Sequence, residues 1–334
     1  MLGLKIMEAL KTSTLIIVED KYKVENWKRG ILENTDLTES NISVFNPNMR
    51  KLKPVTIGTY SGLCDFADQL QGFGFVIYDD AHVFPTPKHE KTIDIPSANK
   101  LALASTLARS DGNGNLVLAL IGPKWYEVLY LTLVHQKVHV PVTCIEVKIP
   151  LPTEEQQHYL SRDPHKKVNA DSLNSNKAKI VHILLKKEVT KRLLLVSYFQ
   201  EVINQFRDRF KFDILDSHLN EEERLNIINA FNEQKIDKLL TASKLIEHMP
   251  LSMVEVMIAL SHQQGSEREE YLRLGKLLPA EFGKEKAVLY SLISENTEEE
   301  RYYSKRRRKL INQGFHYQIK KFQDLMERGE FFES

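Results

Sequence analysis

Residues 75–82 (F-V-I-Y-D-D-A-H) constrain the fold of this chain more than any other segment, because four apolar residues are followed by two acids, an alanine and a histidine. An apolar run that ends in acids is typical of a buried parallel strand with functional groups at its carboxyl end. Acids at such a position hold Mg²⁺ and a water molecule in nucleotide-hydrolysing proteins. Those proteins also need a glycine-rich loop with a Lys and a Ser or Thr. No G-x-x-x-x-G-K-[ST] occurs in this sequence, so the usual phosphate-binding loop is missing.

Length and composition indicate a soluble, intracellular protein of two domains. The chain has 334 residues, of which 42% are hydrophobic and 27% charged, enough for two separate cores. The net charge of +1 provides no overall basic field, so any nucleic-acid site must be a local patch. Cys64 and Cys144 are far apart and predict neither a disulfide nor a zinc site. No signal sequence or membrane-length apolar run is present, and no membrane partner is expected.

Short apolar runs alternate with polar or glycine-bearing segments in the first part of the chain. After an amphipathic helix marked by Leu4, Met7 and Leu10, strands are expected at 14–18, 55–57, 75–78 and 101–104. This alternation predicts a parallel sheet flanked by helices, the first domain, over residues 1–150. Pro141 and Pro150 mark its end.

The rest of the chain predicts a second domain of the same class. Residues 151–191 are polar and rich in Asn and Lys, which indicates a linker or helical insert. Strands are expected at 193–196, 238–242 and 254–260, with a helix at 221–231, in a second domain over residues 192–297. Residues 298–334 are charged and are expected to form a helical tail that contains the run 305–309 (K-R-R-R-K).

Six segments, in order along nearly the whole chain, resemble motifs of the XPB-type helicases of superfamily 2, the translocases of DNA repair and transcription. The segments are 59–61 (family T-Y-S), 79–82 (D-E-[VA]-H), 101–111 (L-G-L-T-A-T-L-x-R-E-D), 120–127 (L-I-G-P-K-x-Y-E), 265–279 (G-S-x-R-Q-E-x-Q-R-L-G-R-V-L-R) and 303–315 (S-x-K-R…Q-G-[YF]). The resemblance implies an α/β fold with two RecA-like domains, each a parallel sheet flanked by helices, that form a helicase-like core.

Departures from the family pattern concern the nucleotide. The chain begins on the helix that would follow the phosphate loop, so the loop is expected to be absent. Asp80 replaces the Glu of the acid pair, and its shorter side chain leaves the carboxylate one methylene further from the attacking water. Lys276 replaces an Arg and lacks its bidentate fork. Pro279 replaces the terminal Arg and has no group for a phosphate.

These departures predict a core that does not hydrolyse ATP. A displacement of about 1 Å costs roughly 10²-fold in rate, and a missing arginine finger costs about 10³- to 10⁵-fold. Truncation would explain the missing loop but not the substitutions at Asp80, Lys276 and Pro279. No cofactor is therefore expected; ATP and Mg²⁺ would bind only if a phosphate loop lay upstream.

The resemblance also implies roles for individual residues. The degenerate catalytic set consists of Asp79, Asp80, His82, Arg273 and Lys276. The nucleic-acid-binding set, where such helicases touch the sugar-phosphate backbone, consists of Thr59, Tyr60, Ser61, Arg109, Ser243 and Lys244. Hydroxyls and cationic side chains are suitable donors for phosphate. The histidines lack ligand spacing, so no metal site is expected.

Simpler alternatives exist for several of these assignments. The two acids can form a solvated turn after a strand, Arg109 can be an ordinary surface charge, and a Ser-Lys pair is a common turn. The run 305–309 can be a nuclear signal or a phosphate-binding stripe, but three preceding glutamates favour a solvated helix face. Trp27 and Trp125 can stack on bases, although a place in the core is more common for such residues.

The sequence thus predicts a degenerate XPB-like helicase core that binds DNA without sequence preference or docks a protein partner as a structural subunit. The setting would be a DNA repair, transcription or replication assembly. Two alternatives stay open: a fragment of an active ATP-dependent helicase, and a protein-interaction scaffold without DNA affinity. An in-frame phosphate loop upstream would favour the fragment, and salt-dependent DNA binding would exclude the scaffold.

Overall fold

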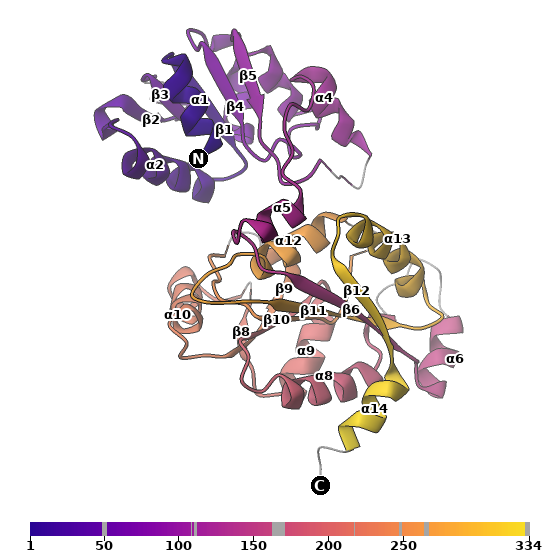
Figure 1. Ribbon diagram of the computed structural model, residues 1–334. Helices are drawn as coiled ribbons and strands as arrows, with labels where there is room; N and C mark the ends of the chain where they lie inside the picture. Colours follow the sequence, from indigo (N-terminus) through magenta and orange to yellow (C-terminus); the bar gives the residue numbers. More distant parts are fainter. Residues whose placement is uncertain are drawn as a thin grey trace. The chain divides into compact units, whose positions relative to one another are not determined.

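The computed structural model describes residues 1–334 except 49–51, 108, 110–111, 162–170, 217, 247–248, 264–266 and 331–334. The chain forms two compact units, Met1–Glu127 and Val128–Ser334. Each unit contains a parallel sheet covered by helices (Figure 1), which confirms the predicted fold class.

The first unit is built on a sheet with the strand order β2-β3-β1-β4-β5 within the described residues. Its strands are β1 (Thr14–Val18), β2 (Ile42–Val44), β3 (Val55–Thr59), β4 (Phe75–Tyr78) and β5 (Asn99–Ala102). Its α-helices are α1 (Leu2–Leu10), α2 (Lys21–Asn34), α3 (Tyr60–Leu63) and α4 (Leu116–Leu120). Short 3₁₀ helices lie at η1 (Glu39–Asn41), η2 (Cys64–Gln69), η3 (His89–Asp94) and η4 (Asn113–Asn115).

Both faces of the first sheet are buried at its centre, so β1 and β4 are almost entirely apolar rather than alternating. On β1, Ile16 and Val18 pack with α1 and α2 through Leu4, Val24 and Ile31. The neighbouring Leu15 and Ile17 face the opposite layer, which contains Tyr60, Leu63 and Phe84. Trp27 packs against the first of these cores, as predicted, whereas Trp125 is 91% exposed and is not a core residue.

The second unit has the strand order β12-β6-β11-β10-β7-β9-β8 within the described residues. Its strands are β6 (Val142–Ile149), β7 (Leu193–Ser197), β8 (Asp213–Leu215), β9 (Lys238–Ala242), β10 (Val256–Ala259), β11 (Ala287–Ser294) and β12 (His316–Lys321). Its helices are α5 (Tyr130–His135), α6 (Thr153–Ser161), α8 (Asn176–Lys187), α9 (Gln200–Arg209), α10 (Glu221–Asn232), α11 (Ser243–Ile246), α12 (Glu267–Leu277), α13 (Glu298–Asn312) and α14 (Phe322–Glu330).

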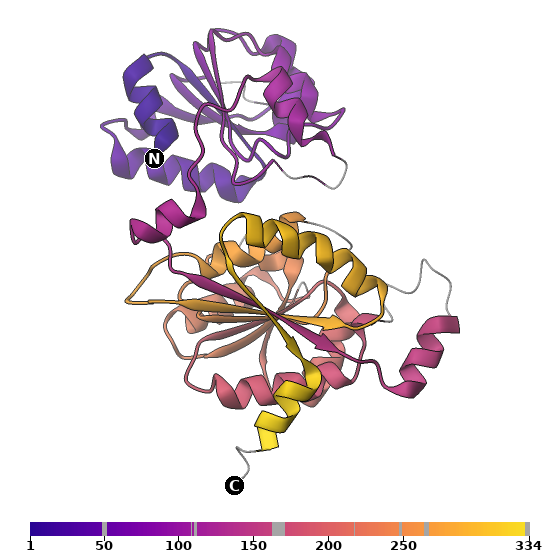
Figure 2. The same ribbon diagram turned by 45° about the vertical axis from the view of Figure 1, so that its right-hand side comes forward.

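Helices cover both faces of this second sheet (Figure 2). Helices α10, α12 and α13 pack on one face through Phe231, Leu274 and Leu310. Helices α8 and α9 pack on the other face, where Leu184 and Phe206 are buried. The strand order changes direction between β7 and β10, and the carboxyl edge at such a switch point is the usual ligand site of an open α/β sheet.

The predicted domain boundaries need correction. The first unit ends at Glu127 rather than residue 150, because β6 pairs with β11 and β12 in the second sheet. Helix α8, in the predicted linker 151–191, buries Ile180 and Leu184 beneath that sheet. The predicted tail 298–334 supplies α13 and the edge strand β12, so it is also part of the second unit.

The predicted strands at 14–18, 55–57, 75–78, 193–196 and 238–242 are confirmed, and 254–260 contains β10. The strand expected at 101–104 lies two residues earlier, at β5. The edge strands β2, β8 and β12 and the longer strands β6 and β11 were not predicted. The edge strands are short or polar, which weakens the apolar signal on which the prediction depends.

Candidate functional site

The carboxyl edge of the first sheet gathers the predicted Thr59 and Asp79 together with Glu19, which was not predicted. Thr59 ends β3, Glu19 follows β1, and Asp79 follows β4. These three strands are adjacent and parallel, and their carboxyl ends therefore meet at one edge.

Asp79 is held by a partner that the sequence analysis did not identify. Trp27 Nε1–H donates a hydrogen bond of 2.7 Å to the Asp79 carboxylate from α2. Burial raises the pKa of Asp79 above its ordinary value, while the Trp27 hydrogen bond, the Lys23 charge and the amino group of Met1 oppose that shift. Gly3 of α1 lies against the ring of Trp27, the residue that holds Asp79, so the start of α1 lies near this edge of the sheet.

Asp80 is paired with a cation rather than free at the surface. Its carboxylate forms an ion pair with Lys23 of α2, and Glu19 also lies 3.5 Å from the Lys23 ammonium. Asp20 caps the same helix by accepting from the Lys23 backbone N–H. Asp80 has a φ of 47°, a left-handed conformation that is uncommon for a residue other than Gly. The turn after β4 therefore directs the two acids to different partners.

His82 and Arg109 are brought together. His82 is buried, and its backbone carbonyl accepts a hydrogen bond from the Arg109 guanidinium. The rest of the R-x-D segment, Ser110 and Asp111, lies outside the described residues. Arg109 thus links the end of its segment to the acid turn within the first unit.

The predicted nucleic-acid set of the first unit is only partly accessible. Thr59 caps α3 through its hydroxyl, which accepts from Gly62 N–H at 3.1 Å, and Ser61 is exposed. Tyr60 is fully buried, and its hydroxyl donates to the backbone carbonyl of Asp79 at 2.9 Å. The assignment of Tyr60 to nucleic-acid binding is therefore wrong, because its ring belongs to the core under the acid turn.

Ser243 and Lys244 begin α11 directly after β9, at the carboxyl edge of the second sheet. Lys244 is exposed, and its ammonium lies 5.5 Å from the centre of the Tyr198 ring, within the range of a cation–π contact. Ser243 is buried, and its hydroxyl accepts from Arg273 at 3.0 Å. Lys244 is thus available to a phosphate, whereas the Ser243 hydroxyl already has an internal donor.

Arg273 and Lys276 both have internal partners. Arg273 is fully buried in α12 and donates to the Ser261 carbonyl at 2.7 Å and to Glu269 at 2.8 Å. Glu269 stands where the family motif has Gln. Lys276 donates to the Met249 carbonyl at 2.6 Å. Gly265 and Ser266, at the start of this motif, lie outside the described residues.

The basic run 305–309 is not simply a solvated face. Arg306 is buried, and Arg307 forms two hydrogen bonds of 2.8 Å with the buried carboxylate of Glu146 on β6. Lys305 and Arg308 are exposed. The three preceding glutamates misled the prediction, because two of the five basic residues point into the unit.

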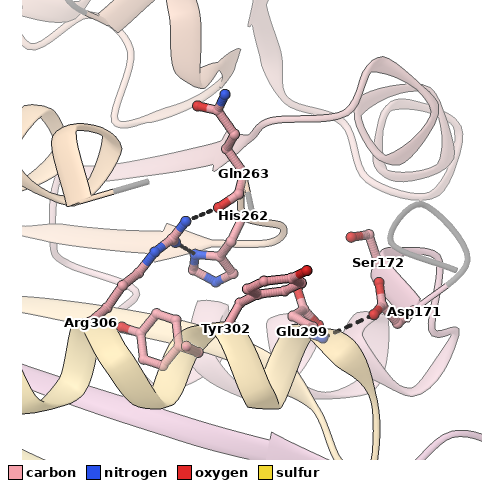
Figure 3. Close-up of a pocket in the computed structure, with 8 residues that line it drawn as sticks. Asp171, Ser172, His262, Gln263, Glu299, Tyr302 and Arg306 are labelled. Atoms are coloured by element: carbon pink, nitrogen blue, oxygen red, sulfur yellow. Dashed lines mark hydrogen bonds between the residues drawn. The ribbon is translucent and has the colours of Figure 1, made fainter. Parts of the chain in front are cut away.

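A small pocket lies beside the carboxyl end of β10 (Figure 3). It is lined by Asp171, Ser172, His262, Gln263, Glu299, Tyr302, Tyr303 and Arg306. Its room is about 10 Å³, the space of one water molecule. The pocket is therefore too small for a nucleotide.

His262 in this pocket is a neutral hydrogen-bonding group. Burial, then the charges of Arg273, Arg306 and Lys177, hold its pKa well below the ordinary value. Its Nδ1 lies 2.7 Å from Arg273 and 3.0 Å from Arg306, both donors, so the ring proton is on Nε2. Among the described residues, Nε2 has no hydrogen-bond partner. Within the same part of the chain, no three His, Cys, Asp or Glu side chains are arranged to hold a metal ion.

Asp171→Asn is expected to reduce the loss of stability as pH rises. Burial and the nearby Glu299 raise the pKa of Asp171 from 3.8 to about 8. The folded state therefore binds a proton more tightly than the unfolded state, and stability falls between about pH 4 and pH 8, by up to about 1.4 kcal/mol per pH unit. In the natural protein the Glu299 N–H donates to the Asp171 carboxylate at 3.0 Å. Asn removes the titration, and its amide oxygen can still accept this hydrogen bond.

The measurement is unfolding temperature at pH 5 and pH 8. The unfolding temperature of Asp171→Asn should rise relative to that of the natural protein as pH increases. Asp208→Asn, on the exposed side of α9, should differ from the natural protein by the same amount at both pH values. An equal offset of Asp171→Asn at both pH values would contradict the shifted pKa.

Known proteins resemble this chain over most of its length. The family model "ERCC3/RAD25/XPB C-terminal helicase" matches residues 133–332. This chain belongs to that family. The DNA 3′-5′ helicase XPB of Kineococcus radiotolerans is 27% identical over 328 residues, which cover 96% of this chain and 59% of that protein. The XPB/SSL2 helicase/translocase subunit of the Saccharomyces cerevisiae general transcription and DNA repair factor IIH is 26% identical, over 96% of this chain and 41% of that protein.

The chain thus spans about half the length of these curated XPB relatives. Among solved structures, Saccharomyces cerevisiae Dbp5 bound to RNA and ADP BeF₃ matches with a TM-score of 0.62 at 14% identity, over 96% of this chain and 81% of that chain. A putative HsdR subunit of a type I restriction enzyme from Vibrio vulnificus matches with a TM-score of 0.66 at 10% identity, over 93% of this chain and 58% of that chain. These likenesses confirm the helicase-type α/β fold. Within the described residues, no helix has the length and apolar character needed to cross a membrane.

Proposed function

We propose that this XPB-type chain is a helicase core that does not turn over ATP and retains sequence-independent binding to nucleic acid. It would act as a structural subunit in a DNA repair, transcription or replication assembly. One observation carries the proposal: the described side chains expected to handle the nucleotide already have partners within their own units. Asp79 accepts from Trp27, Asp80 pairs with Lys23, and Arg273 is enclosed by its neighbours.

The fit of Mg²⁺ and ATP to these residues is poor. A magnesium ion prefers carboxylate oxygens in near-octahedral geometry, and it would have to displace the Lys23 ammonium from Asp80 and compete with Trp27 at Asp79. The Arg273 guanidinium has no exposed surface from which to contact a γ-phosphate. Bound ATP and Mg²⁺ would supply transfer of the γ-phosphoryl group to water. The residues present are poorly arranged to support that reaction.

Nucleic-acid binding is supported by the groups that remain accessible. Ser61 and Lys244 are exposed, and their segments are among those predicted, from the family resemblance, to touch the nucleic-acid backbone. Tyr198, beside Lys244, adds a half-buried aromatic ring. Contacts of this kind recognise phosphate and sugar rather than base sequence. Because the net charge is only +1, binding would depend on these few local contacts.

A second candidate function is favoured by the position of α1. Gly3 of α1 packs against Trp27, which holds Asp79, so the start of α1 lies near the first acid of the predicted Mg²⁺ site. A phosphate loop preceding this helix would be correctly placed for nucleotide binding. The chain would then be part of an active ATP-dependent helicase. A longer product of the same gene that contains G-x-G-K-[ST] and releases phosphate from ATP would establish this candidate.

Lys244→Ala is expected to weaken binding to unrelated oligonucleotides to the same extent, by roughly three- to tenfold, the size of one exposed charged contact of about 1 kcal/mol. The loss should be independent of sequence because a phosphate contact carries no base information. Fluorescence anisotropy across a salt series should show a slope of log K against log salt that is shallower by about 0.7 for single strands or 0.9 for duplexes.

Lys191→Ala is the matched control. Lys191 is partly exposed, but it precedes β7 and pairs with Glu255 at the amino edge of the same sheet. Its loss should leave affinity unchanged. Binding that is undetectable at about 50 mM salt, or unaffected by both Lys244→Ala and Arg109→Ala, would support the protein-interaction scaffold instead.

A further inference from the structure

Arg273 lies at the centre of a buried, charge-balanced cluster in the second unit. The cluster combines two arginines, Arg273 of α12 and Arg306 of α13, with two glutamates, Glu269 and Glu270. Arg273 lies 2.8 Å from Glu269 and 3.5 Å from Glu270, while Arg306 lies 3.5 Å and 3.8 Å from the same two carboxylates. Pairing of this kind offsets the cost of removing charges from water only when the geometry is well satisfied.

Only one of these two arginines reaches the turn that carries Lys244. The same Arg273 nitrogen donates to Ser243 Oγ at 3.0 Å and to the Ser261 carbonyl at 2.7 Å. Arg306 instead approaches His262 and the carbonyl of Gln263. Arg273 therefore connects α12 and the end of β10 to the first residue of α11.

We infer that Arg273 is a positioning residue for nucleic-acid binding, which fixes the turn at Ser243 so that Lys244 points toward the phosphate backbone. The inference rests on the proposed nucleic-acid function. It assigns Arg273 a role different from the nucleotide contact suggested by its motif.

Burial separates these two roles. Arg273 has no exposed surface, so any effect of its replacement on nucleic-acid affinity must pass through a neighbour. Lys244 is the exposed cation adjacent to the residue that Arg273 binds. The Tyr198 ring lies beside the Lys244 ammonium, and the Tyr198 backbone N–H donates to Ser261 Oγ at 2.9 Å. The cationic and aromatic neighbours of the proposed contact are therefore both anchored near Arg273.

The guanidinium shape is essential to this arrangement. Arg273 presents one nitrogen to Ser243, Ser261 and Glu269, and another to His262 Nδ1. A Lys at this position keeps the positive charge near the glutamates, but its single nitrogen, on a shorter side chain, cannot occupy both guanidinium positions, the one beside Ser243 and the one beside His262. Arg273→Lys should therefore release Ser243 while largely preserving the charge balance.

The test combines Arg273→Lys with Lys244→Ala and measures binding of a single-stranded oligonucleotide across a salt series. Arg273→Lys is expected to weaken binding about as much as Lys244→Ala, roughly three- to tenfold, and to reduce the salt slope by about 0.7, the value of one lost phosphate contact. The double variant should bind no more weakly than Lys244→Ala alone, since both changes remove the same contact.

Arg306→Lys is the matched control, because Arg306 is also buried and also meets His262 and the glutamates. It should destabilise the fold comparably without changing the salt slope. Additive losses in the Arg273/Lys244 double variant, or an equal slope change in Arg306→Lys, would overturn the inference. Binding by the natural protein that does not depend on Lys244 would instead count against the proposed function.

Hydrogen exchange provides a readout that needs no nucleic acid. Arg273→Lys should speed exchange of the backbone amides of Lys244 and Leu245 by about tenfold more than Arg306→Lys does, because exchange reports local opening of the turn. Equal exchange in the two variants would overturn the positioning role even if the chain bound no oligonucleotide.

Discussion

Lys177→Met is expected to lower the free energy of unfolding of the second unit by about 3 to 5 kcal/mol, because it leaves a buried carboxylate without its cation. The Lys177 ammonium lies 2.8 Å from Glu299, and the two side chains are 0% and 3% exposed. Lys177 also donates to the carbonyl of Leu260 at 2.8 Å. The pair thus links α8 to the start of α13 and to the end of β10.

Hydrogen exchange of the β7 and β10 amides is the appropriate measurement, since both tryptophans lie in the first unit and their fluorescence would not report this change. Lys191→Met is the matched control. Its pair with Glu255 has a similar distance of 2.7 Å, but Lys191 is 41% exposed, and the expected loss is below about 1 kcal/mol. Adding Glu299→Gln to Lys177→Met should recover part of the stability. Equal losses from the two lysines would contradict the special cost of the buried pair.

The central strands were predictable because their apolar runs are short, buried on both faces and bounded by polar segments. Thr14–Val18 and Leu193–Ser197 are of this kind, and all their residues are buried. The boundary between the units was not predictable in the same way. Strand β6 follows the first unit in sequence, and only its pairing with β11 and β12 assigns it to the second sheet. The composition of a strand does not indicate which distant strands it pairs with.

The candidate site was predictable in its position but not in its partners. The acids at 79 and 80 follow a confirmed strand, and their edge of the sheet was therefore expected. The bonds to Trp27 and Lys23 depend on how α2 packs and cannot be read from the acid motif. For Tyr60, a motif match was taken as a surface contact, although an aromatic ring directly after a buried strand also suits the core.

Arg306 shows the same limitation for charged residues. A run of five basic residues suggests solvent, but the helical period turns every third or fourth side chain to the same face. Tyr303, Arg306 and Leu310 share the buried face of α13. The spacing of Tyr303 and Leu310 was a signal that could have identified Arg306 as an inward-pointing residue.

Phosphate release from ATP is expected to stay at background in this chain and also in its Asp80→Glu variant, with or without DNA. Loss of an arginine finger alone costs about 10³- to 10⁵-fold, and Lys276 and Pro279 in place of the family's arginines predict such a loss here. Glu at position 80 restores the reach of one carboxylate, but Lys23 can still pair with it, and Arg273 remains buried. The effects of residues that act together in catalysis are strongly non-additive, so restoring one of them should raise the rate of phosphate release very little.

A phosphate-release assay across an ATP series, with Asp80→Asn as the matched control, tests this expectation. Asp80→Glu and Asp80→Asn should be indistinguishable. Calorimetry with ATP and Mg²⁺ should give no saturable heat, because this sequence has no G-x-x-x-x-G-K-[ST] loop whose backbone amides and Lys would hold the phosphates. DNA-stimulated turnover in Asp80→Glu that is absent in Asp80→Asn would mean that the acid pair can still exchange its internal partners for Mg²⁺. In that case the ion pair with Lys23 would be a resting state of a working site, and the second candidate, part of an active helicase, would replace the inactive core.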